Sequence, residues 1–125
     1  MDKIMVRDRQ FSVSIPEEKI KKRVAQVAAQ ISDDLKDQHP LFLAVLNGSF
    51  VFAADLMRGI TTPCEISFVR MASYEGTSST GAVKQLIGLK EDIKDRTVVI
   101  VEDIIDSGLT MQHLLNLLAE KQPRA

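Results

Sequence analysis

Two stretches of the chain repeat apolar residues every three or four positions, with polar residues between them. The first stretch, residues 16–38, has its apolar positions at Ile20, Val24, Val27, Ala28, Ile31 and Leu35. This spacing places apolar side chains on one face of a helix, and the acidic pair Glu17 and Glu18 suits the helix amino end. The pattern predicts an amphipathic helix over residues 16–38. Similar spacing predicts a last helix over residues 109–119.

Two other stretches, residues 41–46 and 97–101, are continuously apolar and have the length of a strand. Such runs are typical of parallel strands that are buried on both faces. Each run is followed by a polar turn and then by residues with helical character. Strands that alternate with helices predict an α/β fold, with a mostly parallel twisted sheet flanked by helices. The turns after Leu46 and Val101 are then expected on one rim of the sheet, where such folds bind ligands.

The remaining segments predict smaller elements. Residues 4–9 alternate weakly and predict one short edge strand, and residues 66–71 predict another strand. Residues 73–81 are rich in Ser, Thr and Gly and predict a mobile loop. Residues 83–89 are expected to return as a strand before a charged turn at residues 91–96, which would complete a hairpin arm.

Composition narrows the class of protein. A chain of 125 residues with 45% hydrophobic and 26% charged residues predicts one globular domain. The formal charge of −1 gives no reason to expect nucleic acid or an anionic membrane surface as a partner. Apolar runs are far shorter than the roughly 20 residues of a membrane helix. The lone Cys64 and the absence of a signal peptide predict a cytoplasmic location.

The run VVIVEDIIDSGLT at residues 98–110 carries the most chemistry. Backbone amides at a helix start and the hydroxyls of Ser107 and Thr110 suit a phosphate, and Gly108 permits close approach. The carboxylates of Glu102 and Asp103 can accept hydrogen bonds from a diol or hold Mg²⁺. The simpler alternative is that Asp106 or Ser107 only caps the following helix. The whole pattern favours a site for a ribose phosphate.

This thirteen-residue run resembles the phosphoribosyl-pyrophosphate signature of type I phosphoribosyltransferases, and it is most similar to the hypoxanthine-guanine enzymes. The similarity extends from the first predicted helix to the last. It includes LNGSFVFAADL at residues 46–56 and SYEGTSSTG at residues 73–81. The resemblance implies phosphoribosyl transfer from 5-phosphoribosyl-1-pyrophosphate to hypoxanthine or guanine, which gives IMP or GMP and pyrophosphate in purine salvage.

The resemblance also implies roles for the residues of the signature. Glu102 and Asp103 would contact the ribose hydroxyls, directly or through Mg²⁺, which is the implied cofactor. The 5-phosphate would lie in a cradle made by Asp106, Ser107, Gly108, Leu109 and Thr110. Asp106 would also be the catalytic residue, because it occupies the position that exchanges a proton with N7 of the purine.

Two further segments match loops of that family. The turn at Leu46, Asn47, Gly48 and Ser49 matches a pyrophosphate loop, in which a non-proline cis peptide just before the glycine aims backbone amides at the leaving group. Family members often have Lys or Arg at the position of Asn47. The asparagine therefore leaves this loop without that positive charge. Ser73 and Tyr74 match a lid that closes over the reaction centre. The alternatives are a turn capped by Asn or Ser and an ordinary hairpin tip.

The resemblance stops at Ala125, where the family continues into further strands and a hood segment. We therefore expect one core domain, residues 1–125, without those parts, either as a truncated form of a longer enzyme or as a shortened relative that keeps only the donor site. The chain is expected to form a homo-oligomer, a dimer or a tetramer. The alternatives are a non-catalytic regulator that binds the donor, an inactive fragment, or a phosphate-binding α/β module of another use.

For the histidines and the cysteine we predict structural roles. His39 and His113 lie outside any metal-like cluster, and Cys64 reads as a structural thiol. The basic cluster on the first predicted helix reads as a solvated face; its members are Lys19, Lys21, Lys22 and Arg23.

Overall fold

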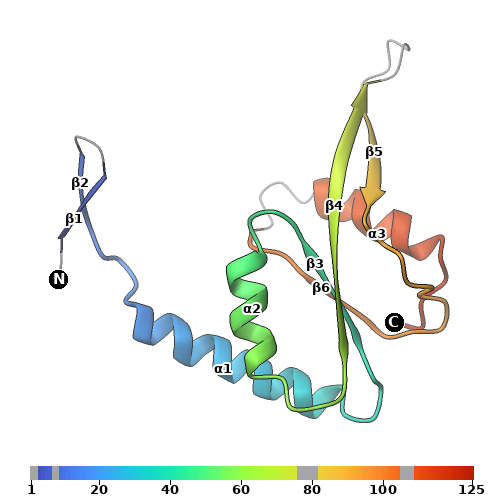
Figure 1. Cartoon of the computed structure of the whole chain (residues 1–125), viewed down its shortest axis with the longest axis horizontal. Helices are drawn as coiled ribbons and strands as arrows, with labels where there is room; N and C mark the ends of the chain where they lie inside the picture. The colour runs from blue at the N-terminus through green and yellow to red at the C-terminus, as the bar shows by residue number, and fades with distance from the viewer. Residues whose placement is uncertain (1–2, 7–8, 76–81, 105–108) are drawn as a thin grey trace.

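The computed structural model describes residues 3–6, 9–75, 82–104 and 109–125. Its strands are β1 (Lys3–Val6), β2 (Arg9–Ser12), β3 (Leu41–Val45), β4 (Glu65–Glu75), β5 (Ala82–Ile87) and β6 (Val98–Val101). Its helices are α1 (Glu17–Asp34), α2 (Phe50–Arg58) and α3 (Leu109–Ala119), as Figure 1 shows. Among these helices, none combines the length and apolar character required to cross a membrane.

The main sheet has the strand order β5-β4-β3-β6. Strand β3 runs parallel to both of its neighbours, with Leu41 opposite Glu65 of β4 and opposite Val98 of β6. Strands β4 and β5 pair antiparallel and form the predicted hairpin arm. The predicted α/β class and mostly parallel sheet are confirmed.

The core lies on the two faces of β3, whose five residues are all buried. Successive side chains of a strand point to opposite faces. Leu41, Leu43 and Val45 accordingly pack on the α3 side, with Leu114 and Leu118. Phe42 and Ala44 pack on the other side with residues of α1 and α2, including Ala28, Ala53 and Leu56. Helices thus cover both faces of the sheet (Figure 1).

Some predicted boundaries were wrong. The first helix ends at Asp34 and not near residue 38, because the backbone at Asp37 and His39 is left-handed (φ 71° and 49°) as the chain turns into β3. The single strand predicted at residues 4–9 is an antiparallel pair, β1 and β2. Its second strand was missed because Phe11 is the one apolar residue of β2, which leaves too little alternation to detect.

The loop predicted at residues 73–81 begins later than expected. Ser73, Tyr74 and Glu75 belong to β4, where they pair with β5. Cross-strand pairing, which local composition does not report, extends the strand into the polar segment. Residues 76–81 lie outside the described residues, so the expected mobility there stays a prediction.

A polar cluster joins the amino ends of the three parallel strands. Arg96, just before β6, places its guanidinium 3.1 Å from Glu65 Oε1 and donates to the backbone oxygen of His39 at 3.2 Å. His39 Nε2 lies 3.4 Å from the same carboxylate oxygen. Thr97 adds a hydrogen bond of 2.9 Å to Gln38. These contacts lie at the end of the sheet opposite to the turns considered next.

Candidate functional site

The turns that follow β3 and β6 lie at the same edge of the sheet. The two strands are parallel neighbours, and their last paired residues are Ala44 and Val101. The turn of residues 46–49 and the acidic loop of residues 102–104 therefore emerge side by side, as expected from the sequence (Figure 1).

Internal hydrogen bonds hold the turn of residues 46–49. The Ser49 side chain is fully buried, and its hydroxyl donates to the backbone oxygen of Val45. Leu46 N–H donates to Val69 O at 2.8 Å, and Phe50 N–H donates to Asn47 O at 3.3 Å. Asn47 and Gly48 are exposed, so the turn presents these two residues at the surface while both of its ends are anchored.

Two features of this turn bear on the sequence predictions. The resemblance implied a non-proline cis peptide just before Gly48. The structure has one at the peptide bond between Leu46 and Asn47, the residue that precedes Gly48. Ser49 occupies the cap position of α2, yet its hydroxyl faces back to the strand and caps no helix amide in the described structure. A plain serine cap therefore does not account for this turn.

The acidic loop holds two carboxylates in different environments. Glu102 is half-buried and Asp103 is exposed. The Asp103 N–H donates to Glu102 Oε1 at 3.0 Å, and the Ile104 N–H donates to Asp103 Oδ1 at 2.9 Å. Burial, followed by the neighbouring Asp103, raises the pKa of Glu102. Hydrogen bonding with Glu102 and with the Ile104 amide lowers the pKa of Asp103. Asp103 is thus the carboxylate that is more readily ionised.

The two turns meet at Gly48 and Asp103. A methyl group built on Gly48 would lie 2.9 Å from Asp103 Cγ and closer still to Oδ2, so the carboxylate packs directly against the glycine backbone. This contact brings an exposed carboxylate next to the backbone of a neighbouring turn. Such an arrangement can bind a ligand that carries both hydroxyl and anionic groups.

The acidic loop has the donor set that Mg²⁺ uses. Magnesium binds oxygen ligands and is commonly held by one or two protein carboxylates, with water and substrate oxygens completing the shell. Asp103 and Glu102 are adjacent carboxylates of this kind, and Asp103 is open to solvent. The described residues contain no group of three or more His, Cys, Asp or Glu side chains fit to hold a metal alone. The adjacent carboxylates Glu102 and Asp103 thus fit one or two positions of a magnesium shell.

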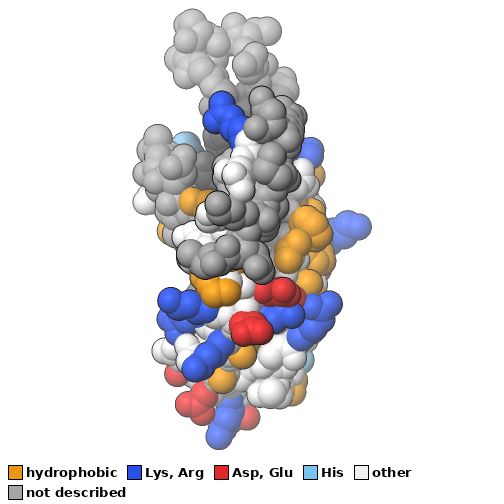
Figure 2. Space-filling model, turned by 90° about the vertical axis from the view of Figure 1, so that its left-hand side faces the viewer, with side chains coloured by type: hydrophobic (Ala, Val, Ile, Leu, Met, Phe, Trp, Pro, Cys, Tyr) orange, Lys and Arg blue, Asp and Glu red, His pale blue; other side chains and the backbone are white. Residues whose placement is uncertain are grey.

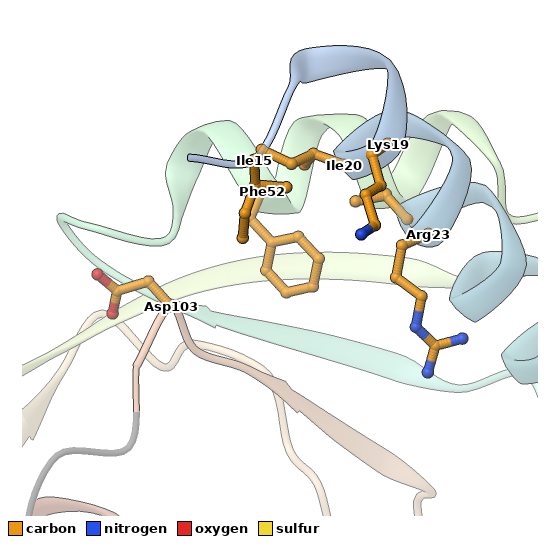
Figure 3. A pocket seen from close by; sticks show the side chains of 7 residues that line it. Ile15, Lys19, Ile20, Arg23, Phe52 and Asp103 are labelled. Carbon is orange, nitrogen blue, oxygen red and sulfur yellow. The ribbon is translucent and has the colours of Figure 1, made fainter. Parts of the chain in front are cut away.

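A pocket of about 460 Å³ lies beside Asp103 (Figure 3). Its walls are mostly apolar side chains of α1, the segment before it and α2, with two cations and one carboxylate, and they comprise Ile15, Lys19, Ile20, Arg23, Val24, Phe52 and Asp103. Figure 2 shows a face on which basic and apolar side chains lie next to one another.

The basic cluster of α1 is exposed, as the sequence predicted, and two of its members also line the pocket. Lys21 does pair with Glu17 at 2.9 Å on the exposed side of α1. Lys19 and Arg23, however, line the pocket. Their spacing of four residues, in step with Ile20 and Val24, was the available signal, because residues four apart share one side of a helix.

The remaining predicted site residues are only partly described. Asp106, Ser107 and Gly108 lie outside the described residues. Leu109 and Thr110 are the first two residues of α3. Ser73 and Tyr74 lie in β4, where they pair with Lys84 and Val83 of β5. The structure therefore brings together the turn of residues 46–49 and the acidic pair, while the phosphate cradle and the lid stay predictions.

Comparison with known proteins gives matches over nearly the whole chain. Residues 15–125 match the phosphoribosyl transferase domain. The chain is 41% identical over 118 residues to a hypoxanthine-guanine phosphoribosyltransferase of Dictyostelium discoideum, which covers 90% of this chain and 66% of the relative. It is 42% identical over 116 residues to a hypoxanthine phosphoribosyltransferase of Salmonella typhimurium, which covers 90% of this chain and 65% of the relative. The chain thus spans slightly less than two thirds of these relatives.

Solved structures agree with these matches. A hypoxanthine-guanine phosphoribosyltransferase of Bacillus anthracis with a HEPES molecule in its active site has a TM-score of 0.81 and 37% identity, over 92% of this chain and 69% of that chain. The corresponding protein of L. donovani has a TM-score of 0.72 and 30% identity, over 86% of this chain and 67% of that chain.

Proposed function

The chain belongs to the phosphoribosyl transferase domain family, and from this premise we propose that it binds 5-phosphoribosyl-1-pyrophosphate with Mg²⁺ and transfers the phosphoribosyl group to hypoxanthine or guanine. The products would be IMP or GMP and pyrophosphate. The observation that carries the proposal is the contact between Gly48 and Asp103, because it joins the two turns that such a donor must bridge.

The proposal gives each turn one end of the donor. The backbone amides of the turn at Leu46, Asn47, Gly48 and Ser49 would face the pyrophosphate. Glu102 and Asp103 would bind the ribose hydroxyls, and both could hold the metal. The low pKa of Asp103 favours its charged form at neutral pH, which suits both uses. A bound Mg²⁺ would supply charge compensation for the departing pyrophosphate.

The rest of the site is proposed from the resemblance. Residues 106–110 would cradle the 5-phosphate at the start of α3, where backbone amides favour an anion. As the base forms its bond to C1 of the ribose and the bond from C1 to the pyrophosphate oxygen breaks, Asp106 would take the proton from N7 of the purine. Ser73 and Tyr74 would belong to a lid that keeps water from the same carbon.

A direct test measures both donor binding and turnover. Calorimetric titration of the parent chain with donor and Mg²⁺ should show binding. Binding should fall by at least about tenfold in the Glu102→Ala/Asp103→Ala variant, because hydrogen bonds to charged groups contribute about 1.5–3 kcal/mol each. The matched control is Asp33→Ala/Asp34→Ala, which removes two adjacent acids at the exposed end of α1 and should leave donor affinity unchanged.

Turnover separates the catalytic proposal from a binding role. Radiolabelled hypoxanthine, guanine, xanthine and adenine are incubated with donor and Mg²⁺, with the parent chain and with Asp106→Ala. Nucleotide formation from hypoxanthine or guanine by the parent alone supports the proposal. Donor binding without conversion of any base would favour the regulator or inactive-fragment alternative, and unchanged affinity in the Glu102→Ala/Asp103→Ala variant would refute the assigned ribose and metal roles.

The proposal extends to the location and assembly of the protein. We propose a cytoplasmic enzyme, since Cys64 is a free thiol and the family match gives no reason for an oxidising compartment. We also propose a homo-oligomer, because α2 exposes Phe50 and Val51 by 61% and 56%, and another copy would cover such side chains. Sedimentation at micromolar concentration tests this, and a monomer throughout would refute it.

A further inference from the structure

Gly48 leaves space for one side chain, that of Asp103. An ideal β-carbon at residue 48 would lie 2.9 Å from Asp103 Cγ and 3.4 Å from Oδ1, with Oδ2 nearer than either. Distances under 3.0 Å are essentially never seen for real β-carbons. Any residue other than glycine at this position would therefore force the carboxylate to move.

The requirement at residue 48 concerns space and not backbone conformation. Gly88 has a φ of 100°, in the left-handed range that favours glycine, whereas the φ of Gly48 lies outside that range. An alanine could thus adopt the backbone of Gly48 without strain, and it would keep the N–H group that the proposed pyrophosphate loop uses. What alanine cannot keep is the position of Asp103.

The Asp103 carboxylate is held from its other side as well. Oδ1 accepts the Ile104 N–H at 2.9 Å, while Oδ2 is the oxygen that rests against Gly48. Asp103 is otherwise exposed. Two contacts from two turns thus fix the orientation of a side chain that solvent alone would leave free to rotate.

We propose that Gly48 is a positioning residue that acts through Asp103. The inference rests on the proposed function: the absence of a side chain at residue 48 seats the ribose- and metal-binding carboxylate against the pyrophosphate turn. The two turns then present their groups to the donor at one fixed spacing. Such preorganisation favours binding, because the ligand does not have to order the carboxylate itself.

The test compares Gly48→Ala with a matched glycine. A β-carbon on Gly59 would lie 2.8 Å from Ala28 Cβ, which is also closer than real β-carbons approach, but this contact joins the end of α2 to the buried Ala28 of α1. The exposed Asp103 can rotate away from a new methyl group, whereas the fully buried Ala28 cannot. We expect Gly59→Ala to lower the melting temperature more than Gly48→Ala does.

Donor affinity should show the opposite order. In titrations with 5-phosphoribosyl-1-pyrophosphate and Mg²⁺, Gly48→Ala should weaken binding by about tenfold, the effect of losing one charged hydrogen bond. Gly59→Ala should leave the affinity of the folded protein unchanged. In ¹⁵N-¹H spectra of the free proteins, the Ile104 amide should shift in Gly48→Ala, because its carboxylate acceptor moves, and should stay in place in Gly59→Ala.

A double-mutant cycle completes the test. In an Asp103→Ala background, adding Gly48→Ala should cause no further loss of affinity, since the two residues act through one contact. A further loss as large as in the parent background would overturn the inference. If Gly48→Ala does not fold, the double variant should fold, and its failure to do so would also overturn it.

The outcomes separate this inference from the proposed function. A parent chain that does not bind the donor refutes the proposed function, and the positioning role with it. A parent that binds the donor, together with a folded Gly48→Ala variant of equal affinity or an unmoved Ile104 amide, refutes the positioning role alone.

Discussion

The packing of α3 on the sheet can be tested with two neighbouring leucines. Leu114 is 1% exposed and packs in the cluster of Leu41, Leu43 and Val69, whereas Leu115 is 47% exposed. The two residues share one helix and one side-chain chemistry. Replacing each by alanine therefore changes burial and little else.

The expected magnitudes follow from that difference in burial. Leu114→Ala removes three buried carbon atoms, about 2.4 kcal/mol at roughly 0.8 kcal/mol each. The cavity left behind adds on the order of 1 kcal/mol, for a total of about 3–4 kcal/mol. For Leu115→Ala, about half of the transfer free energy is lost and no closed cavity forms. The slightly better helix propensity of alanine offsets part of that loss, so we expect about 1 kcal/mol or less.

Urea unfolding followed by far-UV circular dichroism measures both free energies. With a slope of about 1–3 kcal/mol per molar urea, the midpoint for Leu114→Ala should fall by about 1–4 M, with a much smaller change for Leu115→Ala. Leu114→Met nearly conserves the side-chain volume, so it should lower the midpoint much less than Leu114→Ala does. Equal midpoint shifts for the two alanine variants would refute the placement of α3 against the sheet.

Three further outcomes are expected. Ser49→Ala should lower the free energy of unfolding by about 1–2 kcal/mol, because the buried Val45 carbonyl loses its hydroxyl donor; a stability equal to that of the parent would contradict this. Burial, and next the charge of Glu65, raise the pKa of Cys64, so its alkylation should follow a pH curve displaced above that of a free cysteine and return to the ordinary curve in urea. Arg96→Met should cost about 1 kcal/mol of unfolding free energy, and part of that loss should already be present in the parent protein at high salt.

The sequence predicted the elements whose apolar pattern was clear, either as a continuous run or as helical spacing. The apolar run of residues 41–46 became β3, Leu41–Val45, because a fully buried parallel strand contains no polar residue to obscure the pattern. The last helix was predicted with the bounds that the structure gives, Leu109–Ala119. Weak patterns failed: Phe11 alone could not reveal β2, and the polar residues Ser73 to Glu75 joined a strand through pairing with β5.

The candidate site was predicted in part for the same reason. Apolar runs predicted parallel strands, whose carboxyl ends share one rim of the sheet, so Gly48 and Asp103 could be expected at the same edge. The direct contact between them could not, because it depends on the rotamer of one side chain and the exact path of two turns. The pocket residues Lys19 and Arg23 were missed for a similar reason. Basic residues on a helix indicate a solvated face, and a pocket beside them can be recognised only when the position of the neighbouring helix is known.

The polar cluster of Arg96, Glu65 and His39 lies one strand length from the turns at the opposite end of the sheet. Heat tolerance and ligand recognition can therefore change separately in this fold. Random mutagenesis selected for survival at high temperature should collect substitutions around that cluster and leave donor affinity intact. Selection for altered donor use should collect them at the other rim.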